Sequence, residues 1–208
     1  MLQKTSQQKY TSSESLIHSV ISHERESLTD LCDGIPSNTP AIVDMVHQCT
    51  GRIVFTGMGK SGLTAQLLAA TFSSIGIPSL FVHPTEALHG DIGMVQSNDL
   101  CVVLSKSGNG IELEAFVCAL HAQGNKIQLW SCRRGALVAH AQQHALLPLQ
   151  KEAGLFDLVP TSSILVLLSY GHAVGLAVAH LRGFSPDKFF QKHPAGSIGK
   201  QLRKSLGE

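Results

Sequence analysis

Residues 57–62, Gly-Met-Gly-Lys-Ser-Gly, are of the types that bind anions. They follow a short apolar run, 53–56, that predicts a buried strand, and they precede 63–70, whose composition favours a helix. A strand that turns through glycines into a helix presents free backbone N–H groups and the positive end of the helix dipole, which together bind phosphate. The sequence therefore predicts a site for a small phosphorylated ligand, formed by Gly59, Lys60 and Ser61.

The same glycines resemble the patterns of nucleotide-binding proteins only in part. A Walker A loop needs a glycine five residues before Gly59, where this chain has Val54. The pattern G-x-G-x-x-G does fit, but dinucleotide-binding proteins also carry an acidic residue at the end of the second strand. The expected second strand, 79–83, ends in His83 instead. A nucleotide-binding oxidoreductase is thus disfavoured, and no cofactor is expected.

A second polar turn, Ser-Lys-Ser-Gly-Asn-Gly at 105–110, follows the apolar run 99–104. Its hydroxyls and the backbone N–H groups of 107–110 could chelate a phosphate. Serines and glycines also stabilise ordinary turns without any ligand, so that explanation stays open. Because two such turns are more informative than one, we expect the phosphate site to include Ser105, Ser107 and Gly108.

Apolar runs alternate with helix-like segments along the chain. Two helices, 13–33 and 38–49, are expected first, and the expected strands are 52–56, 79–83, 99–104, 126–131 and about 145–149. A short helix near 135–142 and a long one at 161–182 are also expected. This order predicts an α/β fold, a doubly wound, mostly parallel five-stranded sheet with an N-terminal helical pair. Ligands of such sheets lie beyond the carboxyl ends of the strands, so both turns are expected at one edge.

Length and composition limit the class of protein. With 208 residues, 43% of them apolar, the chain is expected to form one domain, 13–208, after a disordered tail, 1–12. A net charge of +1 without a basic tract argues against nucleic acid or a membrane as partner. Five cysteines without a C-x-x-C pair, and no signal peptide, indicate a reduced protein of the cytoplasm. The apolar stretch 164–181 contains Tyr170 and two histidines, which predicts a buried helix rather than a membrane span.

Several further residues could handle protons or contact a ligand, but each has an ordinary explanation when taken alone. His89 and His193 stand in a polar turn and in the tail, where most histidines have no special role. Glu112 falls in the first turn of a predicted helix, where the dipole favours a carboxylate anyway. Lys60 could be a solvated lysine, since lysines are mostly exposed.

The segment around 150–163 has the same ambiguity. Glu152 follows Lys151, which is consistent with a plain surface ion pair. Thr161 and Ser162 begin the long helix after Pro160, so they could be its N-cap or could contact a ligand.

Together these segments resemble the sugar isomerase (SIS) domain, and more narrowly the D-arabinose 5-phosphate isomerases of Kdo synthesis. The resemblance covers about residues 14–205. Its motifs G-M-G-K-S-G, H-G-D-x-G-M and H-P-x-G occur in the family's order. The matching segments are 57–62, 69–74, 81–84, 89–95, 105–108, 151–153, 160–163 and 193–199.

The resemblance implies an aldose–ketose isomerase that interconverts D-arabinose 5-phosphate and D-ribulose 5-phosphate through an enediolate. A carboxylate whose pKa is raised by partial burial would remove a proton from carbon, with Glu152 as first candidate and Glu112 as second. Lys60 would stabilise the enediolate oxygen, and His193 and His89 would move protons between the sugar oxygens. No metal is required, although His89 and His193 could bind zinc adventitiously.

The resemblance also carries expectations about partners and location. SIS domains associate and share active sites between subunits, so a homo-oligomer, most simply a tetramer, is expected, and His89 or His193 could act in a neighbour's site. The small-molecule partner is a sugar phosphate, in the cytoplasm, on the way to lipopolysaccharide or capsule. Family members commonly carry a pair of CBS domains after this domain, so the chain has the extent of a short form or of an excised domain.

Two departures from the family pattern leave alternatives open. Asn109 and Gly110 replace a Glu-Ser pair, which removes one hydroxyl from the phosphate site, and 154–157 replaces Cys-Pro-Leu-Gly near Glu152. An isomerase of another sugar phosphate, such as a heptose or hexulose phosphate, therefore stays open. So does a non-catalytic regulator that binds a sugar phosphate.

Overall fold

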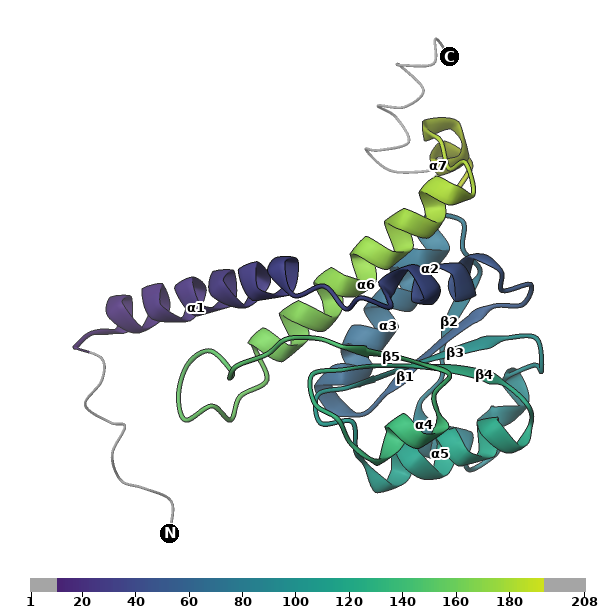
Figure 1. The fold of residues 1–208 in the computed structure, drawn as a ribbon, viewed down its shortest axis with the longest axis horizontal. Helices are drawn as coiled ribbons and strands as arrows, with labels where there is room; N and C mark the ends of the chain where they lie inside the picture. Colours follow the sequence, from purple (N-terminus) through teal and green to yellow (C-terminus); the bar gives the residue numbers. More distant parts are fainter. Residues whose placement is uncertain (1–10, 193–208) are drawn as a thin grey trace.

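The sheet has five strands, all parallel, in a computed structural model that describes residues 11–192. Their order across the sheet is β2-β1-β3-β4-β5, and helices cover both faces (Figure 1). This confirms the predicted fold class. The strands are β1 (Ile53–Gly57), β2 (Ser79–Phe81), β3 (Leu100–Ser105), β4 (Lys126–Ser131) and β5 (Gln143–Leu146).

The central strands are apolar because both of their faces are covered, as expected for a parallel sheet. One face, with Phe55 and Trp130, packs against α2 (Thr39–His47), α3 (Gly59–Ser74) and α6 (Ser162–Leu181). The other face, with Val54 and Val103, packs against α4 (Pro84–Ala87), α5 (Ile111–Ala122) and the 3₁₀ helix η2 (Ala136–His140). A second 3₁₀ helix, η1 (Asp91–Met94), and α7 (Pro186–Lys192) complete the elements described.

Helices α3 and α6 pack very closely. A Cβ atom added at Gly171 would lie 2.5 Å from the side chain of Leu68, and one added at Gly175 would lie 2.6 Å from the ring of Phe72. Helix α6 has the length and mean hydropathy (1.8) of a membrane span. It nevertheless packs into the first apolar core, with Val166 and Val178 fully buried, so the predicted buried helix is confirmed.

Two predicted elements differ from the structure. Strand β5 is Gln143–Leu146, not about 145–149, because its partner β4 ends at Ser131, which pairs with Leu146. Leu147 and Leu149 are buried beyond the end of the strand. The short helix expected at 135–142 is the 3₁₀ helix η2.

Helix α1 (Ser13–Asp33) begins where predicted, at a capping box made by Ser12 and Ser15. Most of its apolar side chains are not buried within this chain. Only Ser27 and Leu31 of its 21 residues are buried, and Ile17 and Ile21 are 60% and 62% exposed. Figure 1 shows α1 projecting away from the sheet. The predicted disordered tail, 1–12, lies almost wholly outside the described residues, and its order stays untested.

Candidate functional site

Both predicted loops leave the sheet at the same place. The chain crosses from β1 to β2 on one side and then returns to β3 on the other, so the strand order reverses between β1 and β3. Gly57, at the end of β1, is in register with Leu104, next to the end of β3. The loops 57–62 and 105–110 therefore begin side by side, at the position where open α/β sheets bind ligands.

The turn from β1 into α3 leaves an open helix N-terminus. Gly62 is needed for close packing, since a Cβ there would lie 2.5 Å from the Gly57 carbonyl oxygen, and Gly59 has a φ of +54°. Lys60 is exposed and Ser61 is half-buried in the first turn. Within the described residues, no acceptor pairs with the N–H groups of Gly59, Lys60 or Ser61. This terminus can thus accept an external anion.

The second loop is held by its own hydrogen bonds. Ser105 Oγ accepts from the N–H of Gly108 (3.0 Å), and Ser107 Oγ accepts from the N–H of Asn109 (3.2 Å). Asn109 Oδ1 accepts from the N–H of Ala136 (2.8 Å), which fastens the loop to η2. Hydrogen bonds within the turn therefore account for both serines without any ligand, and phosphate binding by this loop stays a prediction.

Glu152 is the most enclosed of the predicted catalytic residues that the structure describes, with a side chain that is 0% exposed. Its Oε1 accepts from Lys106 Nζ (2.7 Å) and Ser163 Oγ (2.6 Å). Its Oε2 accepts from the backbone N–H groups of Thr161 (3.0 Å) and Ser163 (2.9 Å). The ion pair suggested by the sequence thus exists, but its partner is Lys106 rather than the adjacent Lys151.

Glu152 also caps α6, which corrects the expectation that Thr161 and Ser162 cap this helix. Thr161 occupies the N-cap position but makes no side-chain cap bond, and its hydroxyl donates to the Ala153 carbonyl (3.0 Å). The carboxylate of Glu152 accepts from the first turn instead, although it precedes its two backbone donors by 9 and 11 residues in the chain. An anion at this end is also favoured by the helix dipole.

The expectation of a raised pKa for Glu152 is wrong for this arrangement. Burial raises the pKa, but the hydrogen bonds from Lys106, Ser163 and Thr161 outweigh burial and hold the pKa below its usual range. Nearby, burial and then the charge of Glu152 raise the pKa of the Cys132 thiol to about 12. The site therefore contains an ionised carboxylate beside a neutral thiol.

The other candidates are more dispersed. Glu112 is exposed in the first turn of α5, and His89 is exposed in the turn after α4. Within the described part of the chain, no contact links either of them to Glu152. Ser162 is buried at the start of α6, and its hydroxyl has no partner among residues 11–192. His193 lies outside the described residues.

Sequence reasoning missed two residues of this site, Lys106 and Ser163. Lys106 stands between the two serines of the 105–110 loop, so a cation inside a phosphate-type loop was a usable signal. Ser163 was part of a recognised motif, but nothing in the sequence indicated that its hydroxyl and its N–H would both bind Glu152. Glu152 and these two partners come from three separate segments, and only folding brings them together.

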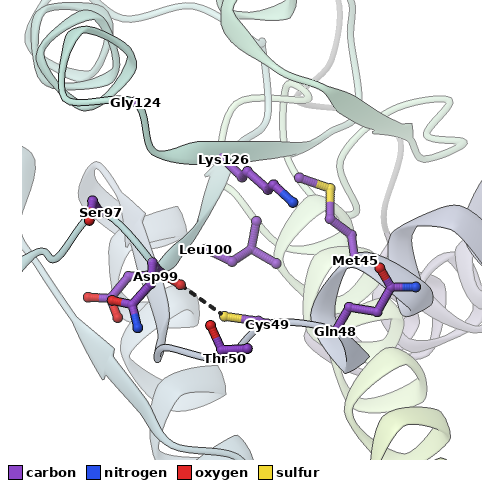
Figure 2. Close-up of a pocket in the computed structure, with 10 residues that line it drawn as sticks. Met45, Gln48, Cys49, Thr50, Ser97, Asp99, Leu100, Gly124 and Lys126 are labelled. Atoms are coloured by element: carbon purple, nitrogen blue, oxygen red, sulfur yellow. Dashed lines mark hydrogen bonds between the residues drawn. The ribbon is translucent and has the colours of Figure 1, made fainter.

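The described residues offer no cluster of metal ligands, and their polar pocket lies away from this site. Among residues 11–192, no three His, Cys, Asp or Glu side chains are grouped to hold a metal ion. The zinc pair His89 and His193 is not tested, because His193 is not described. A pocket of about 190 Å³, lined by Cys49, Asp99 and Lys126 among others, lies at the opposite, amino edge of the sheet (Figure 2). None of the predicted site residues that the structure describes lines it.

Comparison with known proteins agrees with this fold. A family profile described as the SIS domain matches residues 46–177. A Haemophilus influenzae protein named "Probable arabinose 5-phosphate isomerase" is 36% identical over 183 residues, 88% of this chain and 54% of its own length. "Arabinose 5-phosphate isomerase KdsD" of Escherichia coli (strain CFT073) is 38% identical over 184 residues, 88% of this chain and 56% of its own. The chain thus spans about half the length of these curated relatives.

A solved structure is similar over its whole length. It is an Escherichia coli CFT073 protein in complex with arabinose 5-phosphate, and it superposes on this chain with a TM-score of 0.84 at 35% sequence identity. The match covers 88% of this chain and 100% of the other.

Proposed function

The chain belongs to the SIS domain family, and from that premise we propose that it is an aldose–ketose isomerase of a phosphorylated sugar. The proposed substrates are D-arabinose 5-phosphate and D-ribulose 5-phosphate. The names of the two curated relatives support this choice. The proposed role is Kdo synthesis in the cytoplasm, for lipopolysaccharide or capsule.

The observation that carries the proposal is the pairing of two different sites at one edge of the sheet. The N-terminus of α3, with Lys60, is open to an external anion, and Glu152 is a buried, ionised carboxylate linked to the neighbouring loop through Lys106. An isomerase of sugar phosphates needs both parts. The phosphate supplies binding energy away from the reacting carbons, and the carboxylate supplies a base.

The proposed reaction conserves protons and electrons. The base takes the proton from C2, the C–H electron pair forms the C1–C2 double bond, and the carbonyl electrons move to O1 to give the enediolate. The ammonium of Lys60 stabilises the charge on that oxygen. The base then returns the proton to C1, while the proton of the C2 hydroxyl passes to O1. Glu152 is the proposed base and Glu112 the second choice, with His89 and His193 as carriers of the oxygen protons.

Self-association is part of the proposal. Helix α1 buries only Ser27 and Leu31 of its 21 residues, so it gains little from its own chain. Most of the stability of helices in proteins comes from packing an apolar face against a partner. Ile17 and Ile21, one turn apart, remain exposed for a second copy of the chain. We expect a tetramer by light scattering, and Ile17→Glu with Ile21→Glu should yield a smaller species. An unchanged mass would contradict this placement of the interface.

The test of function is a turnover assay with chelator present. Purified protein is incubated with arabinose 5-phosphate, and ribulose 5-phosphate is followed. Lys60→Ala should lower kcat/KM by about 100-fold, because it removes the cation that faces the enediolate. The matched control is Lys126→Ala, an exposed lysine at the opposite edge of the sheet, which should keep full activity. Glu152→Gln and His193→Ala should also lose turnover.

One observation favours a second candidate, the non-catalytic regulator. Hydrogen bonds from Lys106, Thr161 and Ser163 already occupy the carboxylate of Glu152, which is how a purely structural cap would look. A regulator would bind sugar phosphates without turning over any of them, and Glu152→Gln would leave its affinity for them unchanged. An oxidoreductase would instead bind NAD(P)H in a fluorescence titration.

A further inference from the structure

The carboxylate of Glu152 has no unused acceptor position. A carboxylate offers about four such positions. Lys106 Nζ and Ser163 Oγ occupy those on Oε1, and the N–H groups of Thr161 and Ser163 occupy those on Oε2. The Thr161 hydroxyl also lies 3.5 Å from Oε2. The side chain is 0% exposed. In this arrangement Glu152 cannot take a proton from a substrate carbon unless one of the donors leaves.

Only one of these donors can leave without disturbing the fold. Ser163 is completely buried, and both of its donors, like the N–H of Thr161, belong to the start of α6. The side chain of Lys106 is 38% exposed and ends a flexible four-carbon stem. Lys106 is also part of the 105–110 loop, whose neighbours Ser105 and Ser107 are predicted to hold the phosphate.

Resting on the isomerase function proposed above, we propose that Lys106 is a positioning residue that gates Glu152. In the empty site its ammonium holds the carboxylate ionised and in place. A phosphate bound at the 105–110 loop attracts this ammonium, and the acceptor position that it vacates on Oε1 becomes free for the substrate proton. The base is thus released only when a phosphorylated sugar is present. A sugar without phosphate finds the base already occupied.

Within residues 11–192, Lys106 is the only cation that contacts the Glu152 carboxylate. Cys132 is a neutral thiol, because burial and then the charge of Glu152 raise its pKa to about 12. The Arg133 guanidinium donates to the backbone carbonyls of Leu149 (2.6 Å) and Gln150 (3.3 Å). Asp157 accepts from the Glu152 N–H and His23 contacts the Lys151 carbonyl. The adjacent Lys151 is exposed, and within the described residues its side chain makes no ion pair with Glu152.

The test follows the side-chain carboxyl signal of Glu152 by NMR in the full chain, with inorganic phosphate as the probe. The signal is assigned with Glu152→Gln. We expect saturating phosphate to shift it in the wild-type protein but not in Lys106→Met, and Lys106→Arg should restore part of the response. The control is Lys151→Met, which removes the adjacent, exposed lysine without touching the carboxylate and should respond like the wild type.

A kinetic measurement distinguishes gating from a structural role. In Lys106→Met the buried carboxylate has lost its cation, so kcat/KM should fall about tenfold more at pH 6 than at pH 8.5, while Lys151→Met keeps the wild-type profile. An unchanged pH profile of kcat/KM in Lys106→Met, or a Glu152 carboxyl signal that does not shift with phosphate, would overturn the proposal. If arabinose 5-phosphate is not turned over but the carboxyl signal responds to phosphate through Lys106, the gate stands and the proposed reaction fails.

Discussion

Helices α3 and α6 both begin at the carboxyl edge of the sheet, and their N-termini differ in what they face. The first turn of α6 receives a carboxylate from the chain itself, Glu152. The first turn of α3 faces outward, with Lys60 exposed and its backbone N–H groups without acceptors in the described chain. Both termini carry the same partial positive charge. The chain itself fills one anion position, whereas the other, on the proposed function, receives the phosphate of the ligand.

The largest expected effect is on the free energy of unfolding, and it tests whether Glu152 supports the fold while Lys60 does not. Glu152→Ala should lower the free energy of unfolding by about 3 kcal/mol, because it removes a buried ionic partner and leaves the N–H groups of Thr161 and Ser163 unpaired. Lys60→Ala should change it by about 0.5 kcal/mol or less, since the side chain is exposed. Urea denaturation of both variants measures this, and equal losses would break the comparison.

A smaller effect sharpens the description of the open terminus. Gly62→Ala should cost about 2 kcal/mol, because its Cβ would lie 2.5 Å from the Gly57 carbonyl oxygen. Gly59→Ala should cost about 1 kcal/mol, since nothing lies near a Cβ there and only the φ of +54° is unfavourable. Thermal unfolding gives both values. The opposite ranking would mean that the turn is not packed as described.

The smallest expected effect is a loss of stability at low pH. Because the folded pKa of Glu152 is lowered, the residue stabilises the fold above its ordinary unfolded value, about 4.3, and this contribution is lost as pH falls through the folded pKa. The melting temperature of the wild type should therefore fall more steeply below about pH 4.5 than that of Glu152→Gln. Some acid sensitivity will remain in the variant. Burial raises the pKa of Asp99, but its hydrogen bonds from Arg52 and Gln96 outweigh burial and lower it. Parallel melting curves would contradict the charge assigned to Glu152.

The open terminus could be predicted from sequence because all of its parts are local. An apolar run, three glycines and a helix-forming segment occupy 53–70, and the structure has β1, the turn and α3 at those residues. The same holds for β3 and the 105–110 loop. Both loops were expected at one edge because ligands of open parallel sheets bind beyond the carboxyl ends of the strands.

The occupied terminus could not be predicted in the same way. The sequence identified Glu152 as a candidate, but Lys106 lies on a distant segment and the two hydrogen bonds from Ser163 depend on how α6 enters the site. Burial alone predicted a raised pKa, and the donors that reverse the direction were invisible in the sequence. Helix α1 has the predicted bounds, but the sequence does not show what covers its exposed Ile17 and Ile21.

The close contact of α3 and α6 sets the distance between these two helices, and it lies outside the candidate site. Gly171 and Gly175 allow α6 to lie directly on Leu68 and Phe72, well away from both helix N-termini. A methyl group added at either glycine would push the helices apart and so separate the open anion position from Glu152. On the proposed function, substitutions that alter which sugar phosphate fits are therefore expected along this helix contact as well as in the loops. Variants selected for turnover of a longer or a shorter sugar phosphate should carry such substitutions along the contact between α3 and α6.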